Sequence, residues 1–292
     1  MQLMGNQSKK FHVWEKENED KSIVNVIGQI LKYKRGYIVR MPEKGGPVVC
    51  CMSGGADAVS NIFIMLNDFG YEVFPFFINR GQSAYQWERA SIKHYDQLFK
   101  ERFPKLYHET KEIKVNTPAR EYKKDLREVK KKCYETEASA HVSYPARNSI
   151  IFLTGMEYAL SLKNKGKDVT TLFVAHVASD TSYHCSLTWQ RILNLEICHT
   201  FHDYQLQLIS LPIEIEFGNY FDKDVYLKYC YKNGLDLTKT RTCIRKDEIQ
   251  CGTCPCCWDR RRSFLEAGIK DETRYQKPYP EKSGRYYDST LK

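Results

Sequence analysis

The sequence has no long hydrophobic run. No stretch approaches the roughly 20 apolar residues that a helix needs to span a bilayer. The N-terminal segment, Met1 to Lys10, is polar and lacks the apolar centre of a secretory signal. These absences argue against a membrane protein and against export, so we expect a cytoplasmic protein with no membrane partner.

The cysteines are not spread evenly along the chain. The chain has 11 cysteines, and five of them fall between Cys243 and Cys257. A disulfide framework would distribute cysteines along a short secreted chain, whereas clustering in a long chain favours a metal site in a reducing compartment. The scattered ones are Cys50, Cys51, Cys133, Cys185, Cys198 and Cys230.

Negative charge is in the minority, and the formal net charge is +9. This excess of positive charge has two interpretations. It can reflect a solvated surface rich in lysine, or it can serve to attract a nucleotide, a nucleic acid or an acidic protein partner. Hydrophobic residues make up 42% of the chain, which is enough for a globular core. The length of 292 residues suits one large domain, with or without extensions.

Apolar segments alternate with amphipathic ones along most of the chain, and we find no internal repeat. This alternation predicts an α/β fold, a parallel sheet with helices on both faces. The polar residues 1–21 are expected to form a loosely held arm. We expect strands at 36–41, 48–52, 72–78, 113–115, 170–176 and 206–211, and helices at 22–33, 58–69, 85–103, 120–132, 146–163, 221–234 and 258–268.

A Gly-Gly turn joins the strand at 48–52 to the next helix. Its glycines permit a tight turn and a close approach to a ligand, and the helix N-terminus adds N–H donors for an anion. Ser53 offers a hydroxyl, and Asp57 offers a carboxylate that caps the helix or orients Mg²⁺. A tight connection without a ligand also fits these residues. The residues assigned to this phosphate loop are Met52, Ser53, Gly54, Gly55, Ala56 and Asp57.

The cysteine cluster has the spacing of a zinc site. Cys251, Cys254 and Cys257 form a C-x₂-C-x₂-C run, and Cys243 lies eight residues upstream. Each step makes a tight turn that aims two thiolates at one point, and Cys243 completes the tetrahedron that Zn²⁺ prefers. Cys256 breaks the spacing and is excluded as a ligand. Four thiolates leave no open position, so the predicted role is structural.

With these motifs the chain resembles the QueC family of 7-cyano-7-deazaguanine synthases, in the PP-loop ATP pyrophosphatase superfamily. The likeness runs from about Val48 to Tyr275. The matching segments are Ser53–Asp57 for SGGxDS, Arg80-Gly81-Gln82 in part for YGQ, Tyr144-Pro145-Ala146-Arg147-Asn148 for VPxRN, the four cysteines for SCY…CGxCxxC, and Phe264–Gly268 in the tail.

The resemblance implies a Rossmann-like PP-loop fold, a homodimer, and the use of ATP, Mg²⁺ and Zn²⁺. It implies residues 1–46 as an N-terminal extension, 47–235 as the nucleotide-binding domain with a charged insert around 104–141, and 236–292 as a zinc-binding segment. Family enzymes adenylylate the carboxylate of 7-carboxy-7-deazaguanine and transfer it to ammonia, and a second ATP-dependent step gives the nitrile. Catalytic roles fall to Asp57, Ser53 and Arg147, and ATP contacts extend to Gly81 and Gln82.

Four residues are candidates for contact with the substrate. Arg147 and Asn148 open a helix beside the expected site, where capping or ion pairing is the alternative. Asp180 follows a strand at the carboxyl edge, where ligands bind in such sheets, and a loop cap is its alternative. Tyr183 could stack on a purine-like ring or pack in the fold. By contrast, His176 is interpreted as a satisfied core histidine.

The chain departs from the family pattern at several positions. Ala58 replaces the second serine of SGGxDS, and Ser83 stands where a basic residue is common. In the substrate segment, His184 replaces an acidic residue and Ser186 an arginine. Loss of that arginine removes a donor that could hold a carboxylate or fix the local loop. Cys185 of this segment is interpreted as packed rather than nucleophilic.

Three hypotheses follow. The first is carboxylate activation with transfer to ammonia. The second is a QueC-like enzyme of bacterial antiviral defence (type IV CBASS) that attaches a deazaguanine to a protein amine. The third is an inactive zinc-containing fold that binds nucleic acid or protein. The intact loop, with Arg147 and Asn148, favours an enzyme.

Overall fold

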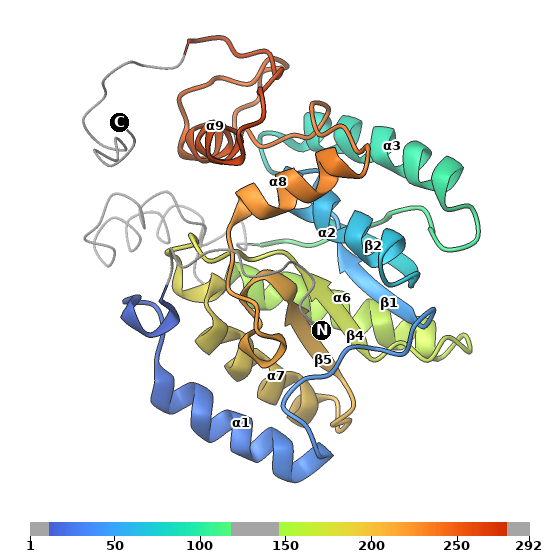
Figure 1. Ribbon diagram of the computed structural model, residues 1–292. Helices are drawn as coiled ribbons and strands as arrows, with labels where there is room; N and C mark the ends of the chain where they lie inside the picture. Colours follow the sequence, from blue (N-terminus) through green and yellow to red (C-terminus); the bar gives the residue numbers. More distant parts are fainter. Residues whose placement is uncertain (1–11, 118–145, 279–292) are drawn as a thin grey trace.

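The computed structural model describes residues 12–117 and 146–278. Within them lies a five-stranded parallel sheet with the order β3-β2-β1-β4-β5 (Figure 1). The predicted α/β fold is therefore confirmed. The strands are β1 (Pro47–Cys51), β2 (Glu72–Asn79), β3 (Lys111–Lys114), β4 (Thr171–Val174) and β5 (Gln207–Ser210).

Helices cover both faces of this sheet (Figure 1). One apolar core joins the sheet to α2, α3 and α8, and the other joins it to α6 and α7. In the described part of the chain, no helix is long and apolar enough to cross a membrane. The helices are α1 (Lys21–Arg35), α2 (Ala56–Asn67), α3 (Tyr85–Arg102), α6 (Arg147–Lys163), α7 (Leu187–Thr200), α8 (Lys223–Lys232) and α9 (Pro255–Ala267), with 3-10 turns η1 (Val13–Glu15), η3 (Tyr183–Cys185), η4 (Leu211–Ile213) and η5 (Ile215–Phe217).

The central strand β1 shows why the sequence selects this architecture. Val48, Val49 and Cys50 are fully buried. Val48 and Cys50 pack into one core and Val49 into the other, because successive side chains of a strand point to opposite faces. A strand buried on both faces must be apolar throughout, which explains its unbroken hydrophobic run.

The strand order creates a crevice at the carboxyl end of β1. The chain leaves β1 through α2 towards β2 and β3, and later returns on the other side of β1 as β4. The connections after β1 and β4 therefore lead to opposite faces of the sheet. Such a switch point is where open α/β sheets bind ligands.

Two parts of the secondary structure differ from expectation. Residues 36–41 form no strand. Their backbone bonds to a side chain instead, because Gln207 donates to the Arg40 carbonyl and accepts from its N–H. Helix α7 is a further difference, since no helix was expected there and its first turn coincides with the end of the substrate segment. The predicted helix at 120–132 lies outside the described residues.

The expected loosely held arm is wrong for its described part. Residues 16–20, here called the N-terminal strap, bind the loop that follows β4. Lys16 Nζ donates to the Ala178 and Asp180 carbonyls at 2.7 and 2.8 Å. Glu19 accepts hydrogen bonds from the first two N–H groups of α7 and from the Thr188 hydroxyl. A carboxylate at a helix N-terminus is favoured by the unpaired donors and the helix dipole.

Replacing Glu19 by Ala tests the strap, with Glu17→Ala as the control. Glu17 is exposed and carries the same charge. We expect the Glu19 variant to lose about 2 kcal/mol of the free energy of unfolding, because three hydrogen bonds to one carboxylate disappear. The control should change by less than about 0.5 kcal/mol. Urea denaturation followed by circular dichroism measures both, and equal effects would contradict a specific strap.

Candidate functional site

A cavity of about 750 Å³ opens at the carboxyl ends of β1, β2 and β4. Its volume lies in the range of small-molecule sites. Its walls come from the phosphate loop, the segment after β2, the start of α6, the loop after β4, and residues of α8 and α9. The predicted residues that line it are Ser53, Gly55, Asp57, Gln82, Arg147, Asn148 and Asp180.

The phosphate loop depends on the backbone of Gly54. This residue has a φ of +74°, and a Cβ there would lie 2.9 Å from the Glu88 carbonyl oxygen. The Gly54 carbonyl accepts hydrogen bonds from Ser91 Oγ at 2.8 Å and from the Arg241 N–H at 2.7 Å. Ser53 Oγ accepts a bond from the Gly55 N–H. The loop is therefore held from its carbonyl side, while α2 begins at Ala56 with its free N–H groups.

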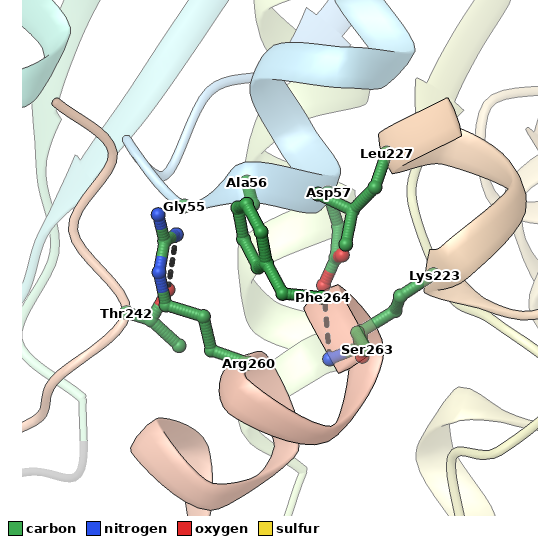
Figure 2. Close-up of a pocket in the computed structure, with 9 residues that line it drawn as sticks. All are labelled: Gly55, Ala56, Asp57, Lys223, Leu227, Thr242, Arg260, Ser263 and Phe264. Carbon is green, nitrogen blue, oxygen red and sulfur yellow. Dashed lines mark hydrogen bonds and ion pairs between the residues drawn. The ribbon is translucent and has the colours of Figure 1, made fainter. Parts of the chain in front are cut away.

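Of the four other residues predicted to contact the nucleotide, only one lines the main cavity. Met52 is fully buried and packs in the core, so only its backbone is near the loop. Ala56 lines a small hollow of about 50 Å³ behind the loop (Figure 2). Gln82 lines the main cavity and is fixed by its bonds to Ile78 and Glu88. Gly81 is not part of the cavity wall.

Asp57 is paired with a lysine that the sequence reasoning missed. Lys223, the first residue of α8, lies with its Nζ 3.1 Å from Asp57 Oδ2 (Figure 2). Its Nζ also contacts the Asp259 carboxylate. Burial raises the pKa of Asp57, and Lys223 opposes that rise. Burial also disfavours the charged form of Lys223, but Asp259 and Asp57 hold its pKa well above the usual range. Lys223 is therefore an ammonium group beside the phosphate loop, held by two carboxylates.

Arg147 and Asn148 divide two tasks at the start of α6. Asn148 is buried and donates to the His184 carbonyl and to Cys185 Sγ, so it ties α6 to the loop after β4. Arg147 donates from Nε to Asn148, and its terminal nitrogens have no hydrogen-bond partner among the described residues. Burial and Arg80 lower the pKa of Arg147, which still leaves it charged. Tyr144 and Pro145 of this motif lie outside the described residues.

The substrate candidates of the loop after β4 lie apart. Asp180 lines the cavity, and its Oδ2 accepts a bond from the Val177 N–H, so it is both a loop cap and a wall residue. Burial raises the pKa of Asp180 to about 6. Tyr183 is 67% exposed and is not part of the wall. Cys185 lines the cavity, and burial raises the pKa of its thiol, which agrees with its interpretation as unreactive.

The interpretation of His176 as a satisfied core histidine is wrong in one respect. The residue is buried at 7% exposure, as a core residue would be. Its Nδ1, however, has no hydrogen-bond partner in the described part of the chain. The residue also lines the cavity. The sequence carried no signal for this, because a lone histidine in an apolar strand is more often paired.

The four predicted cysteines meet at one point. The Sγ atoms of Cys243, Cys251, Cys254 and Cys257 all lie within 4.8 Å of one another, and Cys256 is not in the group. Zn–S bonds of about 2.3 Å in a tetrahedron place sulfurs about 3.8 Å apart. The Cys251 and Cys257 sulfurs are 3.9 Å apart. The four buried thiols therefore fit a structural zinc ion, and N–H groups of the same turn bond to Cys251 Sγ.

Arg241 links the cysteine cluster to the phosphate loop. Its N–H bonds to Gly54, and its guanidinium bonds to the carbonyls of Cys243, Arg245, Asp247 and Glu248. Nearby, Arg260 of α9 donates to Thr240 and Thr242, beside the hollow of Figure 2. The segment that carries the cysteines is thus fastened directly to the loop at the cavity.

A pair of adjacent cysteines tests the metal assignment. The unsubstituted chain and Cys256→Ser should each hold one zinc ion per chain, because Cys256 is outside the cluster. Cys257→Ser should lose most of its zinc, since it removes one of four thiolates. Metal analysis by mass spectrometry measures this. Iron in place of zinc, or equal losses in both variants, would contradict the assignment.

Asp180 should make stability depend on pH. A carboxyl whose pKa is raised on folding binds its proton more tightly in the folded chain. The folded chain therefore loses stability as pH rises from the unfolded pKa of about 4 through about 6. Relative to Asp180→Asn, the free energy of unfolding should fall by about 1 kcal/mol between pH 5 and pH 7. Urea denaturation at both pH values checks this, and a constant difference would contradict it.

Comparison with known proteins gives a match over the same part of the chain. The family model described as "Queuosine biosynthesis protein QueC" matches residues 47–268. The chain is 25% identical over 232 residues to the 7-cyano-7-deazaguanine synthase of Caldicellulosiruptor saccharolyticus, covering 78% of this chain and 95% of that protein. It is 28% identical over 258 residues to the synthase of Thermoplasma volcanium, covering 82% and 94%.

A solved structure is also similar in part. It is the U34-tRNA thiolase NcsA from Methanococcus maripaludis with its [4Fe-4S] cluster, which is 11% identical with a TM-score of 0.37 and covers 83% of this chain and 71% of that one. The sequence match spans the sheet, the cavity and the cysteine cluster in their order along the chain. The chain belongs to the QueC family.

Proposed function

We propose that the protein uses ATP to activate the carboxylate of 7-carboxy-7-deazaguanine as an acyl adenylate, and then transfers the acyl group to ammonia. One observation carries the proposal. A phosphate loop with its paired Lys223 lines the same cavity as Arg147, whose terminal nitrogens have no hydrogen-bond partner among the described residues. The loop and Lys223 suit the pyrophosphate that leaves, and Arg147 suits the carboxylate of the substrate. The relatives named above are 7-cyano-7-deazaguanine synthases, which supports this choice of substrate.

The first step needs groups that stabilise the negative charge of the leaving pyrophosphate, rather than a strong base. An oxygen of the substrate carboxylate attacks the α-phosphorus of ATP, and the bond to pyrophosphate breaks. The N–H groups of the loop and the Lys223 ammonium would bind the leaving pyrophosphate. Mg²⁺, when bound, would neutralise part of its charge, and the Asp57 and Asp259 carboxylates are oxygen ligands of the kind it prefers.

In the second step the amine attacks the acyl carbon and AMP departs with its oxygen. With ammonia the product is the amide, and a second activation by ATP would remove the amide oxygen to give the nitrile. Arg147 would hold the carboxylate towards ATP and then stabilise the negative charge that develops on the acyl oxygen. Arg147 is partly buried, and its Nε–H donates to Asn148 Oδ1, which gives it a defined position for this task.

A protein amine is the second candidate acceptor. Ile244 and Leu265 line the cavity and are nevertheless 50% and 63% exposed. An apolar rim at the mouth suits contact with a macromolecule better than contact with ammonia. The inactive alternative is opposed by Asp57, Lys223 and Arg147, three ionisable residues that line one cavity, although Ala58 lacks the hydroxyl of the serine in the family pattern.

Release of pyrophosphate tests the proposal. The protein is incubated with Mg-ATP and 7-carboxy-7-deazaguanine, with ammonia or candidate proteins as acceptors, and the products are identified by mass spectrometry. A nitrile or amide supports ammonia, and a mass gain on a protein supports the second candidate. Asp57→Asn and Lys223→Ala should each slow pyrophosphate release by about 100-fold or more, because each removes charge control at the loop.

Lys228→Ala is the matched control for the lysine variant. Lys228 lies in the same helix, and its side chain is 43% exposed beside Asp224. This control should release pyrophosphate at the unsubstituted rate. No release by the unsubstituted protein with any acceptor would contradict the proposal, and equal rates for Lys223→Ala and Lys228→Ala would remove Lys223 from the mechanism.

A further inference from the structure

His176 stands in an aromatic corner of the cavity wall. It lies just beyond β4, and its ring centroid is 5.6 Å from that of Phe152 and 5.8 Å from that of Trp189. Ser210 fixes its backbone, since the Ser210 hydroxyl accepts from the His176 N–H and donates to the His176 carbonyl. The position of the ring is therefore set by packing and by two hydrogen bonds.

The imidazole lacks partners that a buried polar ring normally has. Its Nδ1 is buried and has no hydrogen-bond partner among the described residues. An unsatisfied buried donor or acceptor costs about 1–3 kcal/mol. A phenylalanine of similar shape would fill the corner without this cost. Such unpaired groups in a cavity wall are expected where a ligand supplies the missing partner.

The charge state of the ring defines what it can bind. The charged and titratable groups that face it are His184 of η3 and Arg147 of α6. Burial, together with these two groups, lowers the pKa of His176 to about 3. The ring is therefore neutral at physiological pH, with one nitrogen as donor and the other as acceptor. It can recognise a hydrogen-bonding edge but cannot serve as an acid near neutrality.

The surroundings indicate a flat ligand. Phe152, Ile151, Val174 and Ala175 line the cavity near this corner and offer apolar surface. Arg147 lines the same cavity and lies close enough to His176 to affect its protonation. An apolar corner with one neutral polar ring and one nearby cation matches a planar heterocycle that carries an anionic group.

We propose that His176 determines specificity by hydrogen bonding to the edge of a planar, purine-like base that packs against Phe152. The assignment of that base to 7-carboxy-7-deazaguanine rests on the proposed function, with the carboxylate at Arg147. His176 is then the residue that distinguishes a base with an adjacent donor or acceptor from an apolar ring of the same size.

Two variants separate hydrogen bonding from packing. His176→Phe keeps an aromatic ring and removes both nitrogens, and His176→Asn restores a donor and an acceptor near the Nδ1 position. Calorimetry measures the binding of 7-carboxy-7-deazaguanine, guanine and ATP to each folded full-length variant. We expect His176→Phe to weaken binding of the base by about 10-fold to 100-fold. His176→Asn should recover part of this loss, and the Kd of ATP should change less than about 2-fold.

Each outcome decides the inference. Unchanged affinity of His176→Phe for the base overturns it, and so does an equal loss of ATP affinity, which would assign the ring to adenine. If His176→Phe does not fold, His176→Leu, which also removes both nitrogens, is tested in its place with the same expected loss. If the unsubstituted protein binds guanine through His176 but neither binds nor activates 7-carboxy-7-deazaguanine, the proposed function fails and the inference stands. If it binds no planar base, both fail.

Discussion

The carbonyl of Gly54 is the constraint on which the site depends. Its two hydrogen bonds come from Ser91 of α3 and from the backbone of Arg241, so three distant segments meet at one oxygen. Because the loop is held from its carbonyl side, its N–H side can stay open towards the cavity. Arg241 in turn binds the carbonyls of the cysteine segment. A zinc ion there would act at a distance, by keeping Arg241 in the position that shapes the loop.

Charge is distributed around this loop so that no buried ion is left alone. Lys223 lies between Asp57 and Asp259, and removing one partner would leave an uncompensated charge in a poorly hydrated wall. The fully buried Arg191–Glu214 pair follows the same rule far from the loop. Two cavity residues differ: the terminal nitrogens of Arg147 and the Nδ1 of the neutral His176 have no hydrogen-bond partner among the described residues. Both residues line the cavity, where a ligand could supply the missing partners.

Local patterns were readable from the sequence, and long-range pairings were not. The run at Val48 to Cys50 and the spacing of the four cysteines each impose one geometry, so β1 and the cluster could be predicted. Lys223 looked like an ordinary lysine at a helix start, because its partner Asp57 comes from a remote loop. Glu19 likewise gained its role only when folding brought it to the N-terminus of α7. No periodicity encodes such contacts, which is why the strap and the lysine were missed.

The altered substrate segment has a structural explanation. Where the family pattern has an arginine, Ser186 caps α7 by accepting from the Trp189 N–H and donating to the Tyr183 carbonyl. Glu19 of the strap binds the next two N–H groups. If the arginine's task is to fix the loop, the N-terminal extension has taken it over, because Lys16 and Asn18 bind that loop as well. The N-terminal strap then compensates for the arginine that the substrate segment lacks. In that case the departure from the family pattern does not argue for an inactive site.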